Sequence, residues 1–478
     1  MRNQVFKKLF SVLLALIMVA GLLPASAMAG GWGAMDVDTT PVPTETVQPT
    51  ESAEPTAPTE TETPEVTEVP EPTPENPAAT VEPTQGEPTA EPTDEGIMPA
   101  NVMPVQAETE INYVTKTNSS VPLPDGTFYR IVHLDCGRKY FSEAQIKQII
   151  DYAYDYGYTH VELAFGNDGL RFLLDDMKVI ANGTTYTSEK VTSAIQAGNK
   201  AFYNAGTNEL LQEEMDRIIA YAKGKGIGII PMFDAPGHLQ AVVKAMETLK
   251  VDVKYTKPTK SGSSWNYAVD PTDFVSVNFI QALMQKYITY FAGKGCTMFN
   301  IAADECGFTG MSTETYTAYA KLVNSMAAMV QNAGMTALAF NDGIYHIGLT
   351  LESGVEFDTN IAVCYWDASK DKYASATALA GKDFKIINTH NKWYYVPGNA
   401  DSDWFGYEWS KGYMNGEAKD CTKTDDGYSG NNVSGCMNAI WLDNPNVSLT
   451  NEIWTKIENH IALLAQNNPT YFKAEEVK

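Results

Sequence analysis

From about Asn112 onward, short apolar runs alternate with segments of helical periodicity. Apolar runs of this length, bounded by turn signals, are typical of buried strands. The expected strands lie at 129–135, 159–165, 228–233, 299–305, 336–340, 360–366, 384–389 and 436–441. The expected helices begin after Ser142, which heads a capping box with Gln145, and lie at 211–222, 274–291, 313–333 and 452–466. This alternation predicts an α/β fold of the (β/α)8 TIM barrel type. An open doubly wound sheet is the alternative, but no Gly-x-Gly-x-x-Gly follows any expected strand.

The amino-terminal 29 residues have the composition of a secretion signal. Arg2, Lys7 and Lys8 precede an apolar stretch, and Ala27-Met28-Ala29 is a small-x-small cleavage pattern. The apolar stretch is shorter than the ~20 residues that a spanning helix prefers, although retention as an anchor is the alternative. We therefore expect residues 1–29 to be a signal peptide, with no membrane insertion beyond it. The protein is expected to be secreted and extracellular, with association to the cell surface as the alternative.

Residues 30–111 have the composition of a disordered linker. Fifteen of the 25 prolines lie between Pro41 and Pro104, in loose Glu-Pro-Thr repeats with few large apolar residues. Such a segment buries too little apolar surface to offset the entropy of the chain. The same segment holds 18 carboxylates of a chain whose net charge is −25, which leaves a modest negative charge elsewhere. That balance argues against nucleic-acid binding.

The six cysteines do not have metal-binding spacings. No Cys-x-x-Cys or His-x-x-x-His pattern occurs, so we expect no metal and no cofactor. Cys136, Cys296 and Cys364 lie in or beside apolar runs and are expected to be buried as small hydrophobic side chains. Cys421 and Cys436 flank a polar loop and form the pair best placed for a disulfide.

The carboxyl ends of the expected strands are rich in carboxylates and aromatic residues. In a barrel, function gathers at these ends. They carry Asp135, Asn167-Asp168, Asp234 with His238, Asp304-Glu305, Asn341-Asp342, Trp366-Asp367, Trp393-Tyr394 and Trp441 with Asp443. Loops begin there and are polar anyway, which accounts for Asp and Asn but not for three tryptophans. Aromatic faces cover the apolar faces of sugar rings while carboxylates bind hydroxyls, so the set indicates a sugar site.

Five motifs in this order resemble the family 20 glycoside hydrolases, the β-N-acetylhexosaminidases. They are Arg130-x4-Asp135-x2-Arg138-Lys139-Tyr140-Phe141, Gly166-Asn-Asp-Gly-Leu-Arg-Phe172, Asp234-Ala-Pro-Gly-His238, Asp304-Glu305 and Trp441-Leu-Asp443. The resemblance covers about Phe128 to Phe472 and identifies 112–478 as the catalytic domain. One departure lies before the catalytic pair, where the family usually has two glycines and this chain has Ala302 and Ala303. We expect the alanines to need only slightly more room.

The resemblance implies an exo-acting, retaining hydrolase of terminal N-acetylhexosamine in glycans. Its substrate's own acetamido oxygen attacks the anomeric carbon, an exception to the two-carboxylate scheme. Glu305 is then the general acid and base, its pKa raised by its neighbour. Asp304 orients the acetamido N–H and stabilises the oxazolinium ring, and Tyr394 binds the acetamido oxygen, with the adjacent Tyr395 as the alternative.

The same resemblance assigns the remaining site residues. His238 contacts the general acid with Asp168 behind it, or it is a structural histidine in a tight Pro-Gly turn. A hydrophobic box around the acetamido methyl group and the sugar ring is formed by Trp366, Trp393 and Trp441. Arg130 and Asp443 bind the outer hydroxyls, with Arg138 as an alternative to Arg130.

Three other functions remain open from the sequence. A lacto-N-biosidase would release Gal-β1,3-GlcNAc and differ in the shape of its loops. A chitinase-like barrel expects Asp-x-Asp-x-Glu along the fourth strand, whereas the two acids are adjacent here. A non-catalytic glycan-binding adhesin suits the linker and the aromatic residues, but binding alone gives no reason for Asp304-Glu305.

Overall fold

The computed structural model describes residues 109–117, 121–201, 208–256 and 267–472. The predicted signal peptide and nearly all of the predicted linker lie outside the described residues, so both stay predictions. Within the described part of the chain, none of the helices combines the length and the apolar composition that crossing a membrane requires.

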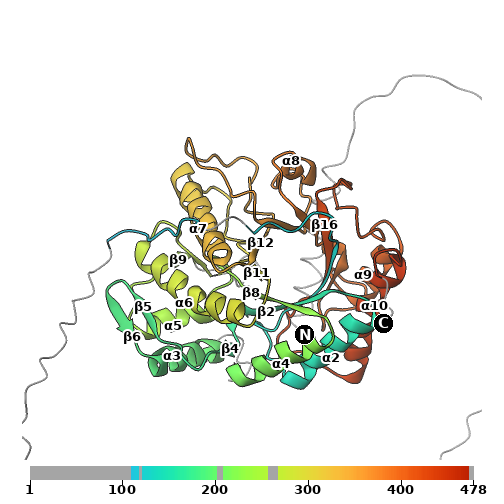
Figure 1. Ribbon diagram of the computed structural model, residues 1–478, viewed down its shortest axis with the longest axis horizontal. Coiled ribbons are helices and arrows are strands. Elements are labelled where there is room, and N and C mark those ends of the chain that lie inside the picture. Colours follow the sequence, from blue (N-terminus) through green and yellow to red (C-terminus); the bar gives the residue numbers. More distant parts are fainter. Residues whose placement is uncertain (1–108, 118–120, 202–207, 257–266, 473–478) are drawn as a thin grey trace, which may run out of the picture. The chain divides into compact units, whose positions relative to one another are not determined.

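Eight parallel strands form a closed barrel. They are β1 (Tyr129–Leu134), β2 (His160–Asn167), β8 (Gly228–Phe233), β11 (Met298–Asn300), β12 (Thr336–Phe340), β13 (Ala362–Tyr365), β14 (Ile386–Asn388) and β16 (Val433–Ile440). Each pairs in parallel with the next, and β1 pairs with both β2 and β16, which closes the ring. The helices lie outside the strands (Figure 1). The predicted (β/α)8 barrel is confirmed.

Helices follow most of the strands. They are α2 (Glu143–Asp155), α3 (Ser188–Ala201), α4 (Gln212–Gly224), α5 (Gln240–Thr248), α6 (Phe274–Gly293), α7 (Thr313–Asn332), α8 (Ala376–Ala380), the 3-10 helix η1 (Asn391–Trp393), α9 (Tyr407–Asn415) and α10 (Asn451–Asn467). The predicted capping box is present, because Ser142 accepts from Gln145 N and the Gln145 side chain bonds the Ser142 backbone. The helix expected after Ser142 begins at Glu143, and the four helices predicted with both ends are confirmed to within two residues.

In the described part of the chain, eight further strands, each of two or three residues, lie outside the set of eight barrel strands. They are β3 (Gly169–Leu170), β4 (Phe172–Leu173), β5 (Val179–Ala181), β6 (Thr184–Tyr186), β7 (Leu210–Leu211), β9 (Tyr255–Thr256), β10 (Ala268–Val269) and β15 (Tyr394–Tyr395). The last of these runs parallel to the end of β16, so Tyr394 lies beside Ala439 and Tyr395 beside Ile440.

The barrel strands are buried on both faces, which explains their nearly continuous apolar sequences. Ile131, Ile230 and Leu338 belong to a cluster inside the barrel, and a larger cluster fills the space between strands and helices. The chain enters along the outer helices, where Asn112 N donates to Asn278 Oδ1 of α6 and Val114 N to Ser325 Oγ of α7. Among the described residues, packing against the outer helices thus begins by Asn112, and the domain boundary stays a prediction.

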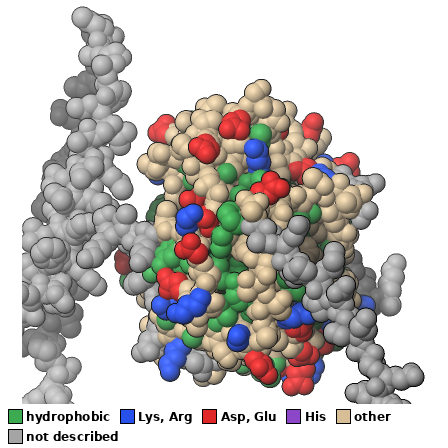
Figure 2. All heavy atoms as spheres, turned by 90° about the vertical axis from the view of Figure 1, so that its left-hand side faces the viewer, with side chains coloured by type: hydrophobic (Ala, Val, Ile, Leu, Met, Phe, Trp, Pro, Cys, Tyr) green, Lys and Arg blue, Asp and Glu red, His purple; other side chains and the backbone are tan. Residues whose placement is uncertain are grey.

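Charged residues are spread over the outer surface. Acidic and basic side chains are interspersed on the face that Figure 2 shows. Some are paired, as Lys286 is with Asp176 at 3.2 Å. Such exposed pairs contribute little stability, about 0–1 kcal/mol each.

All six cysteines are free thiols. The predicted bridge between Cys421 and Cys436 is therefore wrong for this structure. Both side chains are fully buried and pack in the large apolar cluster. They act there as small hydrophobic residues, as the other buried cysteines do.

Candidate active site

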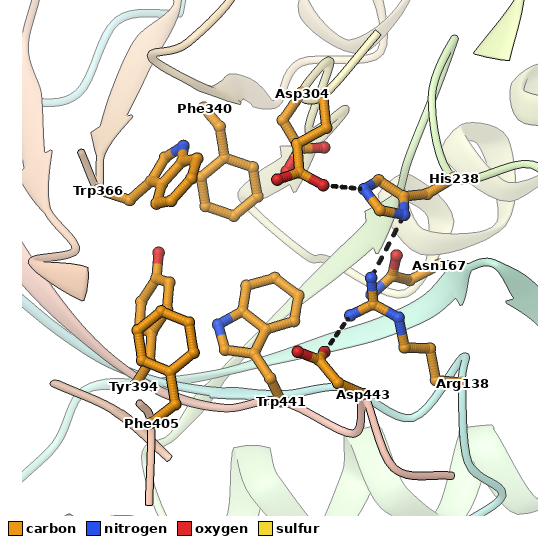
Figure 3. A pocket seen from close by; sticks show the side chains of 11 residues that line it. Arg138, Asn167, His238, Asp304, Phe340, Trp366, Tyr394, Phe405, Trp441 and Asp443 are labelled. Carbon is orange, nitrogen blue, oxygen red and sulfur yellow. Dashed lines mark hydrogen bonds and ion pairs between the residues drawn. The ribbon is translucent and has the colours of Figure 1, made fainter. Parts of the chain in front are cut away.

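A pocket with a cavity volume of about 100 Å³ opens at the carboxyl ends of the barrel strands (Figure 3). It is lined by Arg138, Asn167, His238, Asp304, Glu305, Phe340, Trp366, Tyr394, Phe405, Trp441 and Asp443. Charged groups face aromatic ones across it (Figure 3), a combination that is typical of small-molecule sites. Seven of these residues are site residues that the sequence predicted.

The chain leaves the barrel abruptly before the two adjacent acids. Strand β11 ends at Asn300, whose Oδ1 accepts a hydrogen bond from Ala302 N at 2.8 Å. Ala302 and Ala303 have φ values of 53° and 58°, and Glu305 has 45°. This left-handed backbone costs a non-glycine residue roughly 1–2 kcal/mol. The expectation that the alanines need only room is therefore incomplete, because they also carry backbone strain.

The left-handed turn points the two acids to different places. The side chain of Asp304 is 9% exposed and lies within the pocket, whereas that of Glu305 is 46% exposed and lies at its mouth. The backbone N–H of Glu305 donates to Asp342 Oδ2 at 2.7 Å, and Trp366 Nε1 donates to Asp342 Oδ1 at 3.5 Å. Asp342 thus ties the turn to the wall contributed by the end of β13.

His238 joins the exposed acid to a buried one. Its Nε2 lies 3.1 Å from Glu305 Oε2, and its Nδ1 lies 3.0 Å from Asp168 Oδ1. Burial alone lowers the pKa of His238, but the Asp168 carboxylate and the bond to Glu305 outweigh it and raise that pKa well above its ordinary value. The predicted contacts of His238 and Asp168 are present. Asp168 is buried and bonds side chains of the site rather than lining the pocket.

The pKa of Glu305 is lowered rather than raised. Burial raises it, but the hydrogen bond from His238 and the positive charges of His238 and Arg138 outweigh that effect. The sequence-based expectation considered only the neighbouring Asp304. It is wrong for the unliganded site, because the two cations act more strongly on the Glu305 carboxylate than its neighbour does.

Arg138 closes one end of the pocket. Its guanidinium bonds Asp168 Oδ2 at 2.8 Å, Asp135 Oδ2 at 3.1 Å and Asp443 Oδ1 at 3.0 Å. Burial opposes its charge, but these three carboxylates outweigh that effect and raise the pKa of Arg138 well above its ordinary value. Asp135 also accepts from Leu442 N at 3.0 Å, which links the ends of β1 and β16.

The prediction that Arg130 lines the pocket is wrong. Arg130 stands near the amino end of β1, where its side chain donates to Gly157 O at 2.7 Å and Phe128 O at 3.1 Å. The barrel length separates this end from the site. Arg138, the alternative considered from the sequence, occupies the pocket instead, together with the predicted Asp443.

Aromatic rings form the other walls. Trp366 and Tyr394 are nearly parallel, with centroids 6.3 Å apart and planes 18° apart, and Trp441 meets Tyr394 edge-on at 5.6 Å. Tyr394 lines the pocket, whereas Tyr395 turns away and contacts Tyr407 at 5.8 Å. The sequence left open whether Tyr394 or Tyr395 faces the site, and in the structure it is Tyr394.

Trp393 does not belong to these walls. It is fully buried outside the pocket, and its Nε1 donates to Ala418 O at 2.6 Å. The predicted role of Trp393 in the box is thus wrong, since the chain turns through η1 and directs alternate side chains inward and outward. Phe340 and Phe405 line the pocket in its place. Phe340 ends β12, a position that could have indicated its role, but Phe405 lies in a loop without such a signal.

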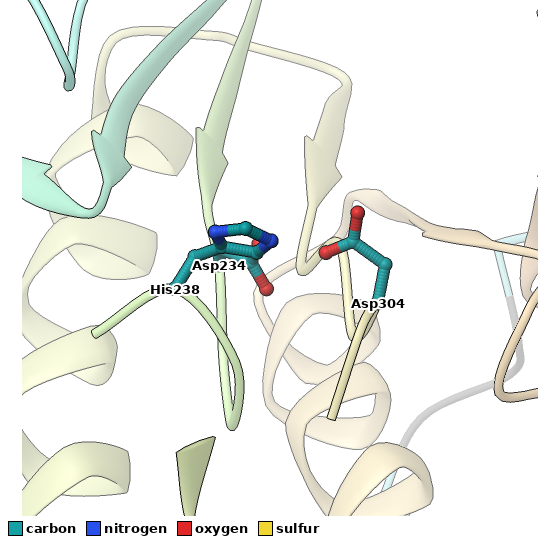
Figure 4. A group of neighbouring side chains, drawn as sticks. All are labelled: Asp234, His238 and Asp304. Carbon is teal, nitrogen blue, oxygen red and sulfur yellow. The ribbon is translucent and has the colours of Figure 1, made fainter. Parts of the chain in front are cut away.

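Asp234 lies next to His238 and Asp304 (Figure 4). One donor atom each of Asp234, His238 and Asp304 lies within 4.8 Å of the others, so among the described residues this group is the candidate for a metal (Figure 4). Both ring nitrogens of His238 already face carboxylates, and an imidazolium has no lone pair for a metal. The cluster is therefore better described as a hydrogen-bonded acid network than as a metal site.

Asp234 is the buried acid of this group and has a raised pKa. It is 1% exposed, and within the described chain no N–H or O–H group of the protein donates to its oxygens. Burial, reinforced by the Asp304 carboxylate, raises the pKa of Asp234 well above its ordinary value, and burial also raises that of Asp304. The interaction between the two carboxyl groups raises the pKa of Asp234 and lowers that of Asp304, so we infer that Asp234 holds the shared proton.

We expect Asp234→Asn to stabilise the fold at alkaline pH. Because the folded-state pKa of Asp234 lies above its unfolded value, the folded state binds more protons, and wild-type stability falls as pH rises above about 4. Asparagine cannot ionise and still offers an N–H to Asp304. Thermal unfolding at pH 4 and pH 8 should show a variant advantage in Tm only at pH 8. The exposed Asp252 provides the control, since Asp252→Asn should show no such pH-dependent gain. A variant that loses stability progressively as pH rises contradicts a protonated Asp234.

Comparisons with known proteins agree with this site. Residues 128–458 match the model of the glycosyl hydrolase family 20 catalytic domain. A catalytic module of the pneumococcal exo-β-D-N-acetylglucosaminidase is 32% identical, with a TM-score of 0.66 over 73% of this chain and 86% of that one. Dispersin B shares the fold at 21% identity, with a TM-score of 0.53 over 71% of this chain and 98% of that one.

A β-hexosaminidase of Vibrio vulnificus is 24% identical in an alignment of 334 residues that covers 59% of this chain and 38% of that protein. The chain spans less than half the length of the curated relatives that it matches. The family model nevertheless covers most of the chain, including every residue that lines the pocket. The chain belongs to glycosyl hydrolase family 20.

Proposed function

We propose that this protein is an exo-acting β-N-acetylhexosaminidase that removes terminal β-linked N-acetylhexosamine from glycans with retention of configuration. One observation carries the proposal. A buried aspartate, Asp304, and a partly exposed glutamate, Glu305, stand side by side at a pocket walled by Trp366, Tyr394 and Trp441. The names of the similar proteins, β-hexosaminidase and exo-β-D-N-acetylglucosaminidase, agree with it.

The shape of the pocket favours one terminal sugar. Arg138 and Asp443 meet at 3.0 Å, and together they offer donors and acceptors to the hydroxyls of a non-reducing end. The aromatic walls offer faces to the pyranose ring and to the acetamido methyl group. A chain extended beyond these hydroxyls would have to displace the Arg138–Asp443 pair, so we favour release of a monosaccharide over release of a disaccharide.

The proposed reaction has two steps. The acetamido oxygen attacks the anomeric carbon while the glycosidic C–O bond breaks, and Glu305 gives its proton to the leaving oxygen. Asp304 accepts a hydrogen bond from the acetamide N–H and stabilises the positive charge of the oxazolinium ring. The Tyr394 hydroxyl donates a hydrogen bond to the acetamido oxygen. Glu305 then takes a proton from water as that water adds to the anomeric carbon and reopens the ring.

The proton of Glu305 depends on the bound sugar. In the unliganded site the His238 bond holds the pKa of Glu305 below its ordinary value. A sugar seated in the pocket removes water from the half-exposed carboxylate, a change that raises a carboxyl pKa. We infer that binding of substrate converts Glu305 from a carboxylate paired with His238 into the acid that the first step needs.

Four substrates test the proposal side by side. We expect hydrolysis of p-nitrophenyl β-N-acetylglucosaminide or of its galactosamine counterpart, with no comparable turnover of p-nitrophenyl β-glucoside, which lacks the acetamide. A thiazoline analogue of the oxazolinium intermediate should inhibit, as transition-state mimics bind far more tightly than substrates. Equal turnover of the glucoside, or no inhibition by the thiazoline, contradicts the proposal. Preferential turnover of p-nitrophenyl lacto-N-bioside would replace monosaccharide release by disaccharide release.

We also propose that the enzyme acts outside the cell. The observation behind this is the signal-like sequence at residues 1–29, followed by a Pro/Thr/Glu-rich segment of the kind that serves as a spacer. Amino-terminal sequencing of the protein from culture supernatant should give a start at Gly30. A protein confined to the cytosol, with its first residues intact, contradicts this proposal.

A further inference from the structure

Three polar side chains lie inside the barrel. They are His133 of β1, Glu162 of β2 and Asn300 of β11, and each is 0% exposed. Two positions away on the same strands lie apolar residues of the cluster inside the barrel, so the three side chains also face inward; these neighbours are Ile131, Ala164 and Met298. Apolar side chains usually fill the interior of such a barrel. A fully buried carboxylate among them is costly unless hydrogen bonds compensate it.

The three side chains form a series of hydrogen bonds that ends at the backbone of the active site. His133 Nδ1 lies 2.7 Å from Glu162 Oε1, and Asn300 Nδ2 donates to Glu162 Oε2 at 3.0 Å. Asn300 Oδ1 accepts from Ala302 N at 2.8 Å. Ala302 is the first residue of turn 302–305, which carries the two adjacent acids of the pocket. One amide therefore connects the buried carboxylate to this turn.

Glu162 determines which way the amide of Asn300 faces. An amide has a donating and an accepting end, whereas a carboxylate only accepts. The NH2 group of Asn300 therefore faces Glu162, and its oxygen is left to accept from Ala302 N. The opposite orientation would set the NH2 group against the N–H of Ala302 and leave buried donors without an acceptor, which is costly.

The turn 302–305 depends on such restraints. Three of its residues have a left-handed backbone without being glycine, and strain of this kind persists only where the surrounding structure enforces it. The hydrogen bond from Ala302 N to Asn300 holds its first residue, and the bond from Glu305 N to Asp342 holds its last. Without the first bond the turn could relax, and the two acids would move relative to the pocket walls.

His133 extends the series to an aromatic wall of the pocket. Its ring lies 4.1 Å from that of Trp441, centroid to centroid, with the planes 41° apart. Trp441 lines the pocket (Figure 3). The turn that carries the acids and the wall that covers the sugar are thus both supported by groups that bond the same carboxylate, Glu162.

We propose that Glu162 is a positioning residue of the active site. Through Asn300 it holds the turn that presents Asp304 and Glu305 to the sugar, and through His133 it supports Trp441. The inference rests on the proposed function and adds to it a residue that does not line the pocket. Glu162 takes no proton from the substrate and makes no contact with it; its effect is on the geometry of the acids.

A role in packing alone fits this group less well. Apolar residues of similar volume in place of a buried ionic group are often neutral or stabilising. The interior cluster shows that this barrel accommodates large apolar side chains at neighbouring positions. An apolar residue, however, cannot supply two acceptors that fix the direction of a neighbouring amide.

Two variants of Glu162 test the role of its acceptors on N,N′-diacetylchitobiose, a disaccharide whose leaving group is a sugar. Glu162→Met keeps much of the volume but has no acceptor for Asn300. We expect it to lower kcat by ~10², the loss that a displacement of about 1 Å can cause, with a much smaller change in KM. Glu162→Gln should lose far less, because its amide oxygen can accept from Asn300 while its NH2 group donates to the imidazole of His133.

A second pair of variants tests the contact between Glu162 and Asn300 directly. Asn300→Asp sets two carboxylates against each other inside the barrel and should lower kcat as Glu162→Met does. The double variant Glu162→Gln/Asn300→Asp should regain most of the wild-type kcat. Its new amide donates to its new carboxylate, which still accepts from Ala302 N, and its net charge equals that of the wild type.

Asn278 of α6 provides the matched control. It is 5% exposed, and like Asn300 it accepts from one backbone group, Asn112 N at 2.9 Å, and donates to an oxygen, Glu110 O at 2.9 Å. Asn278→Asp makes the same chemical change on the outer side of the barrel. It should leave kcat as in the wild type, whatever it does to Tm.

Kinetics at 25 °C and thermal unfolding by circular dichroism separate position from stability. A wild-type kcat in Glu162→Met overturns the proposal, as does a loss in Glu162→Gln as large as that in Glu162→Met. A double variant no more active than Asn300→Asp overturns it as well. The double variant decides the matter even if a single variant does not fold, because the proposal requires it to fold and to turn over substrate. A wild-type protein that does not cleave the disaccharide contradicts the proposed function instead.

Discussion

Replacing Glu305 by glutamine is expected to lower kcat by ~10²–10⁴ on N,N′-diacetylchitobiose, whose leaving sugar needs a proton, the range that a positioned general acid contributes. Glutamine keeps the size of the side chain and can still bond His238, but it has no proton to give to the leaving oxygen and cannot activate water. KM should change much less than kcat, because the aromatic walls and the Arg138–Asp443 pair still bind the sugar. Steady-state kinetics and binding of the thiazoline analogue measure the two effects separately.

The leaving group provides an internal check on this prediction. A glycoside whose leaving group is already a stable anion needs little help from an acid, so the loss should be smaller for p-nitrophenol than for a sugar alcohol. Glu189→Gln, at an exposed position at the start of α3, is the matched control and should have wild-type kinetics. An unaltered kcat in Glu305→Gln would show that Glu305 is not the general acid, whereas a wild type that binds glycans without turnover would favour a glycan-binding protein.

Much of the fold could be predicted because its signals are local. Parallel barrel strands are buried on both faces, so runs such as 228–233 and 336–340 are apolar throughout and have sharp ends, and both match β8 and β12 residue for residue. The short helices α8 and α9 lack a long apolar stripe and gave no comparable signal. Their form depends on packing against the rest of the domain.

The candidate site was predicted best where a residue directly follows a strand. His238, Asp304, Glu305, Trp366 and Trp441 all stand just past a strand end, and barrel closure brings such positions together. The prediction for Arg130 was wrong because Arg130 is part of the same motif as Arg138 but stands at the opposite end of β1, a barrel length from the pocket. A motif gives the order of residues along the chain, while the pocket selects only those beyond the strand end.

Properties that depend on several neighbours at once were not accessible from the sequence. The pKa of Glu305 is set by His238 and Arg138, which come from different strand ends, more than by the adjacent Asp304. The left-handed backbone at Ala302 and Ala303 could not be predicted either, since glycine, and not alanine, is the residue that usually adopts that conformation. Both features emerge only when the loops are placed against one another.

Replacing Asp304 by asparagine is expected to lower kcat by ~10²–10³, comparable to removing a preorganised electrostatic group from an active site. Asparagine keeps the shape of the side chain and an oxygen for the acetamide N–H, but it removes the charge that stabilises the oxazolinium ion. The surroundings of Asp304 sharpen the effect, because a group that is 9% exposed interacts with a nearby charge more strongly than a solvated one. Hydrolysis of p-nitrophenyl β-N-acetylglucosaminide, followed at several pH values, measures the loss.

The two variants should differ in their affinity for the thiazoline. Glu305→Gln retains the anion beside the bound ring and should keep its inhibition constant near that of the wild type, whereas Asp304→Asn should weaken it in step with the loss of kcat. This contrast follows from the position of the two side chains, one within the pocket and one at its mouth. If instead both variants bind the thiazoline as the wild type does, Asp304 does not act on the cyclised intermediate, and attack by the substrate's own amide is no longer supported.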